Sequence, residues 1–176
     1  LYSKEALWRP IVVRQITKKS GSRARFDLAH ELGHMVLHAG TEAESENVEN
    51  EANAFASAFL LPRAGFIREF TCSKRLDWQK LISLKVRWGV SLQALVRRAY
   101  DLRLLTAVQY RSANVYISKN DWRTNEPAEE SVPFEAPEII YKALALLESK
   151  GTIFKDIAFE LNVKPQILED FMVKGA

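Results

Sequence analysis

Two histidines four residues apart, with a glutamate directly after the first, are the feature that most constrains this 176-residue chain. His30, Glu31 and His34 lie in residues 27–38, where apolar side chains recur at the three- and four-residue spacing of a helix. Residues four apart in a helix are separated by about 400° of rotation, so both imidazoles project from one face, one turn apart. This pattern is typical of a pair that binds one Zn²⁺, with the glutamate able to reach a water molecule at the metal.

The same segment carries signals for where the helix begins and what packs against it. Asp27 is a suitable N-cap, so we expect the helix to begin there, and Gly40 is expected to end it. Gly33 costs about 1 kcal/mol relative to alanine inside a helix. We therefore expect the backbone of another element to pack closely against Gly33.

A catalytic Zn²⁺ site needs a third protein ligand and one open position, and this helix does not supply the ligand. One group of zinc proteases places a third histidine ten residues after the first, where this chain has Gly40. His38 lies one turn beyond His34, but about 80° around the axis from His30 and too far along it to share a tetrahedral ion. We expect His38 to interact with the negative end of the helix dipole instead.

A second helix, predicted over residues 43–61, is rich in glutamate and can offer the missing ligand. Glu49 and Glu51 flank its apolar stripe at similar angles, so periodicity alone does not choose between them. Asn53 follows Glu49 by four residues, and its amide can hydrogen-bond the outer ring nitrogen of a ligand histidine. The residue four after Glu51 is Phe55, which cannot. We therefore predict Glu49 as the metal ligand and Asn53 as its partner in orienting a histidine.

The remaining elements predict a predominantly helical α+β fold with a small N-terminal β-sheet. A β-branched run at residues 9–13 is typical of a short strand. Thr106 is a suitable cap for a helix to residue 118, although residues 115–117 fit a strand equally well. Further helices are predicted at residues 78–88 (ended by Gly89), 91–102 (capped by Ser91), 138–150, 152–161 and 165–172.

A segment with three prolines, residues 123–137, is predicted to be a linker. The predicted domains are residues 1–125 and residues 126–176, the second comprising the linker and a small helical domain. Residues 61–125 carry thirteen Lys and Arg against four acids, whereas residues 126–176 carry five against ten. We interpret these charges as solvated helix faces, because no dense basic tract is interleaved with aromatic residues.

The composition excludes several classes of protein. With 47% hydrophobic and 27% charged residues, the chain is typical of a globular domain rather than a disordered one. No apolar run approaches the roughly 20 residues that a membrane-spanning helix needs. Cys72 is the single cysteine, so no internal disulfide can form, and we expect a cytoplasmic protein.

Several of these segments together resemble the signature of the ImmA/IrrE family of metallo-endopeptidases, and they fall within residues 8–125. They are residues 25–34 around the histidine pair, 49–56 with the order Glu-x-x-Ala-Asn-x-Phe-Ala, 59–62, and 84–91. The resemblance implies a gluzincin-like metallopeptidase core. It also implies that His30, His34 and Glu49 bind the metal, which is Zn²⁺ with Mn²⁺ as an alternative. Glu31 would be the catalytic acid and base.

The resemblance also implies a class of substrate. Members of the family cut helix-turn-helix repressors and thereby release stress-response or mobile-element genes, so we expect a protein substrate of that kind. Many members carry an N-terminal helix-turn-helix domain that this sequence lacks, and we expect the chain to be part of a longer regulator.

Two other functions compete with proteolysis. A metal-binding adaptor could dock a repressor without cutting it, using its basic segment on an acidic partner. Direct DNA binding by residues 151–172 is disfavoured, because acids outnumber bases there and a helix facing phosphates needs the reverse.

Overall fold

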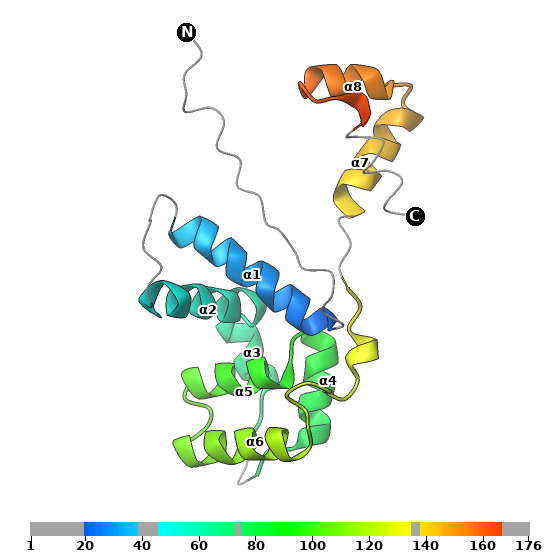
Figure 1. The fold of residues 1–176 in the computed structure, drawn as a ribbon. Coiled ribbons are helices and arrows are strands. Elements are labelled where there is room, and N and C mark those ends of the chain that lie inside the picture. Colours follow the sequence, from blue (N-terminus) through cyan, green and yellow to red (C-terminus); the bar gives the residue numbers. More distant parts are fainter. Residues whose placement is uncertain (1–19, 39–45, 73–74, 135–137, 167–176) are drawn as a thin grey trace. The chain divides into compact units, whose positions relative to one another are not determined.

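The computed structural model describes residues 20–38, 46–72, 75–134 and 138–166, and within these ranges every regular element is a helix (Figure 1). The chain forms two compact units, Leu1–Phe134 and Glu135–Ala176. The β-sheet of the predicted α+β fold, with its strand at residues 9–13, lies outside the described residues. The described part of the chain is therefore all-helical.

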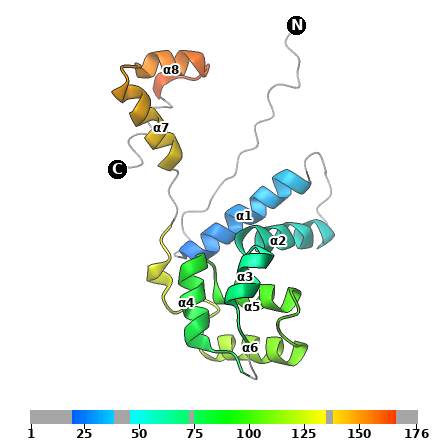
Figure 2. The same ribbon diagram turned by 180° about the vertical axis from the view of Figure 1, so that it is seen from behind.

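Helices α1 (Gly21–Leu37) and α2 (Glu46–Leu60) lie side by side in the first unit (Figures 1 and 2). The two helices approach each other closely at Gly33, where an added β-carbon would lie 3.2 Å from the Cα of Ala52 and 3.1 Å from the ring of Phe55. The expectation that another backbone packs against Gly33 is confirmed. Ala52 and Ala56 are fully buried, and their small side chains help α2 to approach.

The predicted N-cap of α1 is wrong, because the helix begins after Ser20 and Asp27 lies inside it. Ser20 Oγ accepts a hydrogen bond from the backbone N–H of Arg23 at 3.3 Å. Ser20 Oγ also donates to Glu129, 109 residues away, at 2.8 Å. The first turns of α1 are thus stabilised by a distant part of the chain, which a local capping signal does not reveal.

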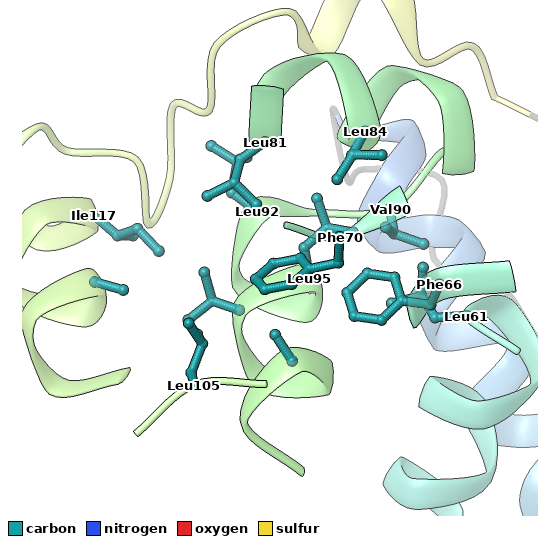
Figure 3. Packing of buried hydrophobic residues seen from close by; sticks show 13 residues of the cluster. Leu61, Phe66, Phe70, Leu81, Leu84, Val90, Leu92, Leu95, Leu105 and Ile117 are labelled. Atoms are coloured by element: carbon teal, nitrogen blue, oxygen red, sulfur yellow. The ribbon is translucent and has the colours of Figure 1, made fainter. Parts of the chain in front are cut away.

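The main hydrophobic core lies among the helices that follow α2 (Figure 3). These are α3 (Arg63–Glu69), α4 (Trp78–Trp88), α5 (Leu92–Asp101) and α6 (Ala107–Lys119). Their fully buried side chains include Phe66, Leu92, Leu95 and Ile117. Helices α1 and α2 are attached to this core.

Local signals in the sequence mark the ends of α4, α5 and α6 correctly. Gly89 ends α4 with φ of 63°, a left-handed conformation that favours glycine. Ser91 caps α5, and Thr106 caps α6 in a capping box. Helix α6 continues through residues 115–117, so these residues do not form a strand. In contrast, α3 is not among the predicted helices.

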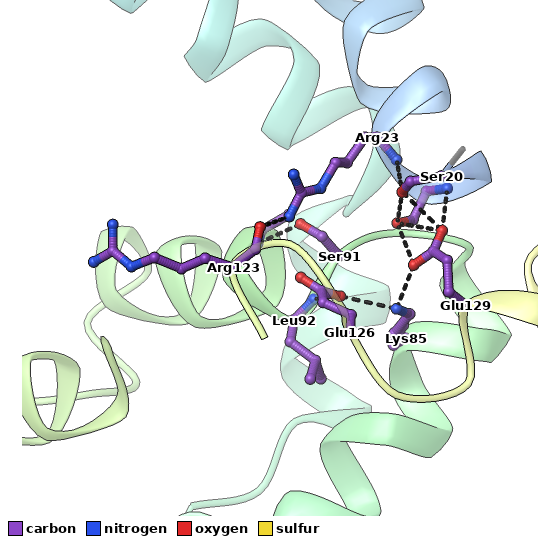
Figure 4. Close-up of polar contacts among 10 residues, drawn as sticks. Ser20, Arg23, Lys85, Ser91, Leu92, Arg123, Glu126 and Glu129 are labelled. Carbon is purple, nitrogen blue, oxygen red and sulfur yellow. Dashed lines mark hydrogen bonds and ion pairs between the residues drawn. The ribbon is translucent and has the colours of Figure 1, made fainter. Parts of the chain in front are cut away.

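A buried charge cluster joins the start of α5 and residues 126–129 to α4 (Figure 4). Lys85 is fully buried, and its Nζ donates to Glu126 Oε2 at 2.9 Å and to Glu129 Oε2 at 2.5 Å. Glu126 Oε2 also accepts the backbone N–H of Leu92 at 2.9 Å. Residues 126–129 therefore belong to the first unit and do not form a free linker. The structure divides the chain after Phe134, whereas the sequence analysis places the boundary after residue 125.

The second unit contains α7 (Glu138–Ser149) and α8 (Phe154–Glu160), close to the helices predicted at 138–150 and 152–161. Its small core consists of Leu144, Ile157 and Ala158, with Val163 packed against it. Most of the helix predicted at 165–172 lies outside the described residues. Among the described helices, none combines the length and apolar character needed to cross a lipid bilayer.

The charge cluster predicts a specific pH dependence of stability. Burial raises the pKa of Glu129, but hydrogen bonds from Lys85, Ser22 and Ser20 outweigh it and lower the pKa from 4.5 to about 2. A carboxyl whose pKa is lower in the folded state stabilises the fold above its unfolded pKa, and this contribution is lost as the pH falls. Glu129→Gln should therefore lower the free energy of unfolding at pH 7 and flatten its decline between pH 4.5 and about 2.

Urea unfolding followed by circular dichroism across this pH range measures the effect. The matched control is Glu130→Gln, at a neighbouring exposed carboxyl. If Glu129→Gln and Glu130→Gln show the same pH dependence, the charge cluster does not stabilise the fold in this way.

Candidate metal centre

The structure brings His30 and His34 of α1 together with Glu49 of α2 in a group that can hold one metal ion. The Nε2 atoms of the two histidines are 3.0 Å apart. The carboxylate of Glu49 spans both, with Oε2 at 3.3 Å from His30 Nε2 and Oε1 at 3.3 Å from His34 Nε2. One candidate ligand atom from each residue lies within 4.8 Å of the other two.

These separations fit a tetrahedral Zn²⁺ site. With Zn–N and Zn–O bonds of about 2.0–2.1 Å, tetrahedral ligand atoms are about 3.3 Å from one another. The two Nε2 atoms are 3.0 Å apart, and each lies 3.3 Å from a different oxygen of the Glu49 carboxylate. An ion between these groups would be held by both nitrogens and by the carboxylate.

The hydrogen bonds around the group favour a cation between its members. Asn53 Oδ1 lies 3.0 Å from His30 Nδ1, and an amide oxygen can only accept. Nδ1 of neutral His30 therefore carries the proton, which leaves a lone pair on Nε2. That lone pair faces the carboxylate of Glu49, which is also an acceptor. A metal ion satisfies both, so the donor set of the site fits the metal that the sequence pattern predicts.

One side of the group is open to solvent. The side chain of Glu49 is 55% exposed, whereas those of His30 and His34 are 17% and 25% exposed. The imidazoles are therefore held by protein on most sides while the carboxylate lies at the edge. Solvent can therefore approach the group from the side of Glu49.

Glu31, the predicted acid and base, follows His30 on the same helix and is exposed. Its carboxylate makes no hydrogen bond or ion pair with another described residue and remains available to a water molecule or substrate. The structure groups His30, His34 and Glu49 and brings Asn53 to His30, while the roles of these residues and of Glu31 stay predictions.

His38 and Glu51 have contacts that the sequence analysis missed. His38 Nδ1 lies 3.2 Å from His34 Nδ1, and His38 Nε2 lies 3.0 Å from Glu51 Oε2. Glu51 is thus directed to His38, whereas Glu49 is directed to the histidine pair. The four-residue spacing from His34 to His38, opposite a glutamate-rich helix, was the signal that could have revealed this contact.

The model of a known protein family matches residues 11–100, about half of the chain. That family is peptidase M78, described by its IrrE N-terminal-like domain. The chain belongs to the peptidase M78 family. Membership confirms the resemblance to the ImmA/IrrE metallopeptidases, and the matched range contains the whole candidate metal centre. A search of curated protein sequences found no match.

In this M78 chain, Gly33→Ala tests whether the close helix contact supports the metal centre. Alanine is intrinsically favoured in a helix by about 1 kcal/mol. However, its β-carbon would meet the backbone of Ala52 at 3.2 Å, so α1 and α2 must shift apart. We expect a lower melting temperature in the presence of a chelator and weaker Zn²⁺ binding, measured by calorimetry.

Ala58→Gly, at an exposed position of α2, measures the intrinsic difference between alanine and glycine in this protein. If Gly33→Ala stabilises the chain by the amount that Ala58→Gly destabilises it, the proposed dependence on close packing is contradicted.

Proposed function

We propose that this chain is a zinc-dependent endopeptidase that cuts a regulatory protein, with a helix-turn-helix repressor as its substrate. Mn²⁺ is the alternative metal. The observation that carries the proposal is the convergence of His30, His34 and Glu49 on one accessible point, in a chain of the M78 family.

In this mechanism His30, His34 and Glu49 hold the ion. Two neutral imidazoles and one carboxylate leave a net charge of about +1 at the centre, which preserves its ability to attract electrons. When bound, Zn²⁺ supplies Lewis acidity toward the scissile carbonyl and the attacking water.

Glu31 transfers a proton from the attacking water to the leaving amine. Its carboxylate accepts a proton from the attacking water as the oxygen bonds to the carbonyl carbon. Glu31 then donates this proton to the nitrogen of the departing amine as the C–N bond breaks. The two products are a carboxylic acid end and an amine end, and Glu31 returns to its starting state.

A cavity of about 1280 Å³ supports the proposal that the substrate is a peptide chain. It lies among α1, α2, α5 and residues 124–129, and Asn53, which contacts His30, forms part of its wall. Most of the residues that line it are polar or charged, and they include Arg23, Arg97 and Arg98. Asn53 is the lining residue that links this cavity to the metal centre, and a cavity of this size can accept several residues of an extended chain.

Glu31→Gln tests the proposal because glutamine keeps the shape of the side chain but cannot take up the proton. General acid–base catalysis contributes about 10²–10⁴-fold, so cleavage should slow by that factor. Zn²⁺ affinity should remain that of the unchanged protein. The experiment incubates the Zn²⁺-loaded protein with purified helix-turn-helix repressors and identifies fragments by mass spectrometry.

The matched control is Glu46→Gln, at an exposed carboxyl of α2, which should cleave at the normal rate. Full activity of Glu31→Gln would refute Glu31 as the base. Tight binding of a repressor by the unchanged protein without fragments would favour the adaptor function instead.

A further inference from the structure

A chain of hydrogen bonds leads from the metal centre to the exposed carboxylate of Glu51. His34 Nδ1 is 3.2 Å from His38 Nδ1, and His38 Nε2 is 3.0 Å from Glu51 Oε2. The backbone N–H of His38 also donates to the carbonyl of His34 at 2.9 Å, so His38 is held to His34 by two contacts. The side chain of His38 is only 10% exposed, whereas that of Glu51 is 63% exposed.

The carboxylate at the end of this chain sets the direction of every bond in it. An ionised carboxylate only accepts, so Nε2 of neutral His38 carries the proton and its Nδ1 has a lone pair. His34 Nδ1 must then be the donor to His38 Nδ1. The remaining nitrogen of His34, Nε2, therefore carries a lone pair, and this atom faces His30 and Glu49.

A second arrangement makes the same number of hydrogen bonds but none to Glu51, so without Glu51 it would be the better bonded of the two. His38 Nδ1 can donate to His34 Nδ1, and His34 Nε2 can then donate to His30 Nε2 at 3.0 Å. This alternative closes the metal face, because its two ligand nitrogens are hydrogen-bonded to each other. Glu51 opposes this arrangement, because the lone pair of His38 Nε2 would then face a second acceptor at 3.0 Å.

We propose that Glu51, acting through His38, is a positioning residue that holds His34 in the tautomer with a free lone pair on Nε2. The inference rests on the metal site proposed above. It adds a residue that keeps the lone pair of His34 Nε2 free for the metal. Each ligand histidine then has its own outer partner: Asn53 for His30 and the His38–Glu51 pair for His34. Outer partners of this kind orient metal-binding imidazoles and raise their basicity.

The substitution Glu51→Gln separates this role from mere packing. Glutamine has the same shape, but its amide can either accept from His38 or donate to it, so it does not impose a direction on the chain. A purely structural contact would survive the change. A positioning role predicts mixed tautomers of His34 and His38 and an affinity for Zn²⁺ lowered by about 10–100-fold.

Nitrogen NMR of the three histidines reads the tautomers directly. In the metal-free protein at a pH where the rings are neutral, we expect His34 with its proton on Nδ1 and His38 with its proton on Nε2. In Glu51→Gln, part of His34 should move its proton to Nε2. Glu46→Ala, on the same helix, should change neither the tautomers nor Zn²⁺ affinity measured by chelator competition.

The inference is overturned if metal-free His34 carries its proton on Nε2, or if Glu51→Gln leaves both tautomers and Zn²⁺ affinity unchanged. Its failure is distinguishable from failure of the proposed peptidase. If the tautomers and the affinity loss are as expected while repressors stay intact, the positioning role stands and the proteolytic function does not.

Discussion

Gly33 lets α2 approach α1 so closely that a β-carbon at this position would lie 3.2 Å from the Cα of Ala52, and the metal centre depends on that contact. At this separation the carboxylate of Glu49 lies 3.3 Å from Nε2 of both His30 and His34, and a wider separation of the helices would draw it away. The glycine that weakens α1 by about 1 kcal/mol as an isolated helix is thus required where the helices pack. Gly33 lowers the intrinsic stability of α1, and it also allows α2 to bring Glu49 close to the histidines.

Contacts at the other ends of α1 and α2 hold this pair to the helical core. Ser20 and Ser22 bind Glu129, which shares Lys85 with Glu126, so the start of α1 is connected to α4. At the end of α2, the carbonyl of Leu61 accepts a hydrogen bond from Arg98 Nε at 3.0 Å. Burial lowers the pKa of Arg98, although its side chain stays charged at neutral pH because arginine is so basic. The metal centre therefore lies on a helix pair anchored by partly buried polar contacts.

The sequence was sufficient to predict the parts of the site that obey local rules. The spacing of His30 and His34 follows from helix geometry, and Asn53 distinguished Glu49 from Glu51 by a chemical argument about hydrogen bonding. The caps at Ser91 and Thr106 are local as well.

What the sequence analysis missed depends on contacts between distant residues. Asp27 is a reasonable cap by itself, but Ser20 caps α1 and is supported by Glu129, 109 residues away. Residues 126–129 lie within the predicted linker. Lys85 of α4 holds them in place, and no local pattern in the sequence reveals that contact. His38 is predicted not to bind the metal, and its contacts with His34 and Glu51 depend on where α2 places Glu51, which the sequence does not reveal.

Zinc K-edge X-ray absorption of the Zn²⁺-loaded chain tests most directly whether two imidazoles and one carboxylate form the metal site. The account predicts one zinc per chain, coordinated only by nitrogen and oxygen at about 2.0–2.1 Å, with the scattering pattern of two imidazoles. A sulfur ligand at about 2.3 Å, which Cys72 would have to supply, would contradict it. So would the absence of stoichiometric zinc or a spectrum with fewer than two imidazoles.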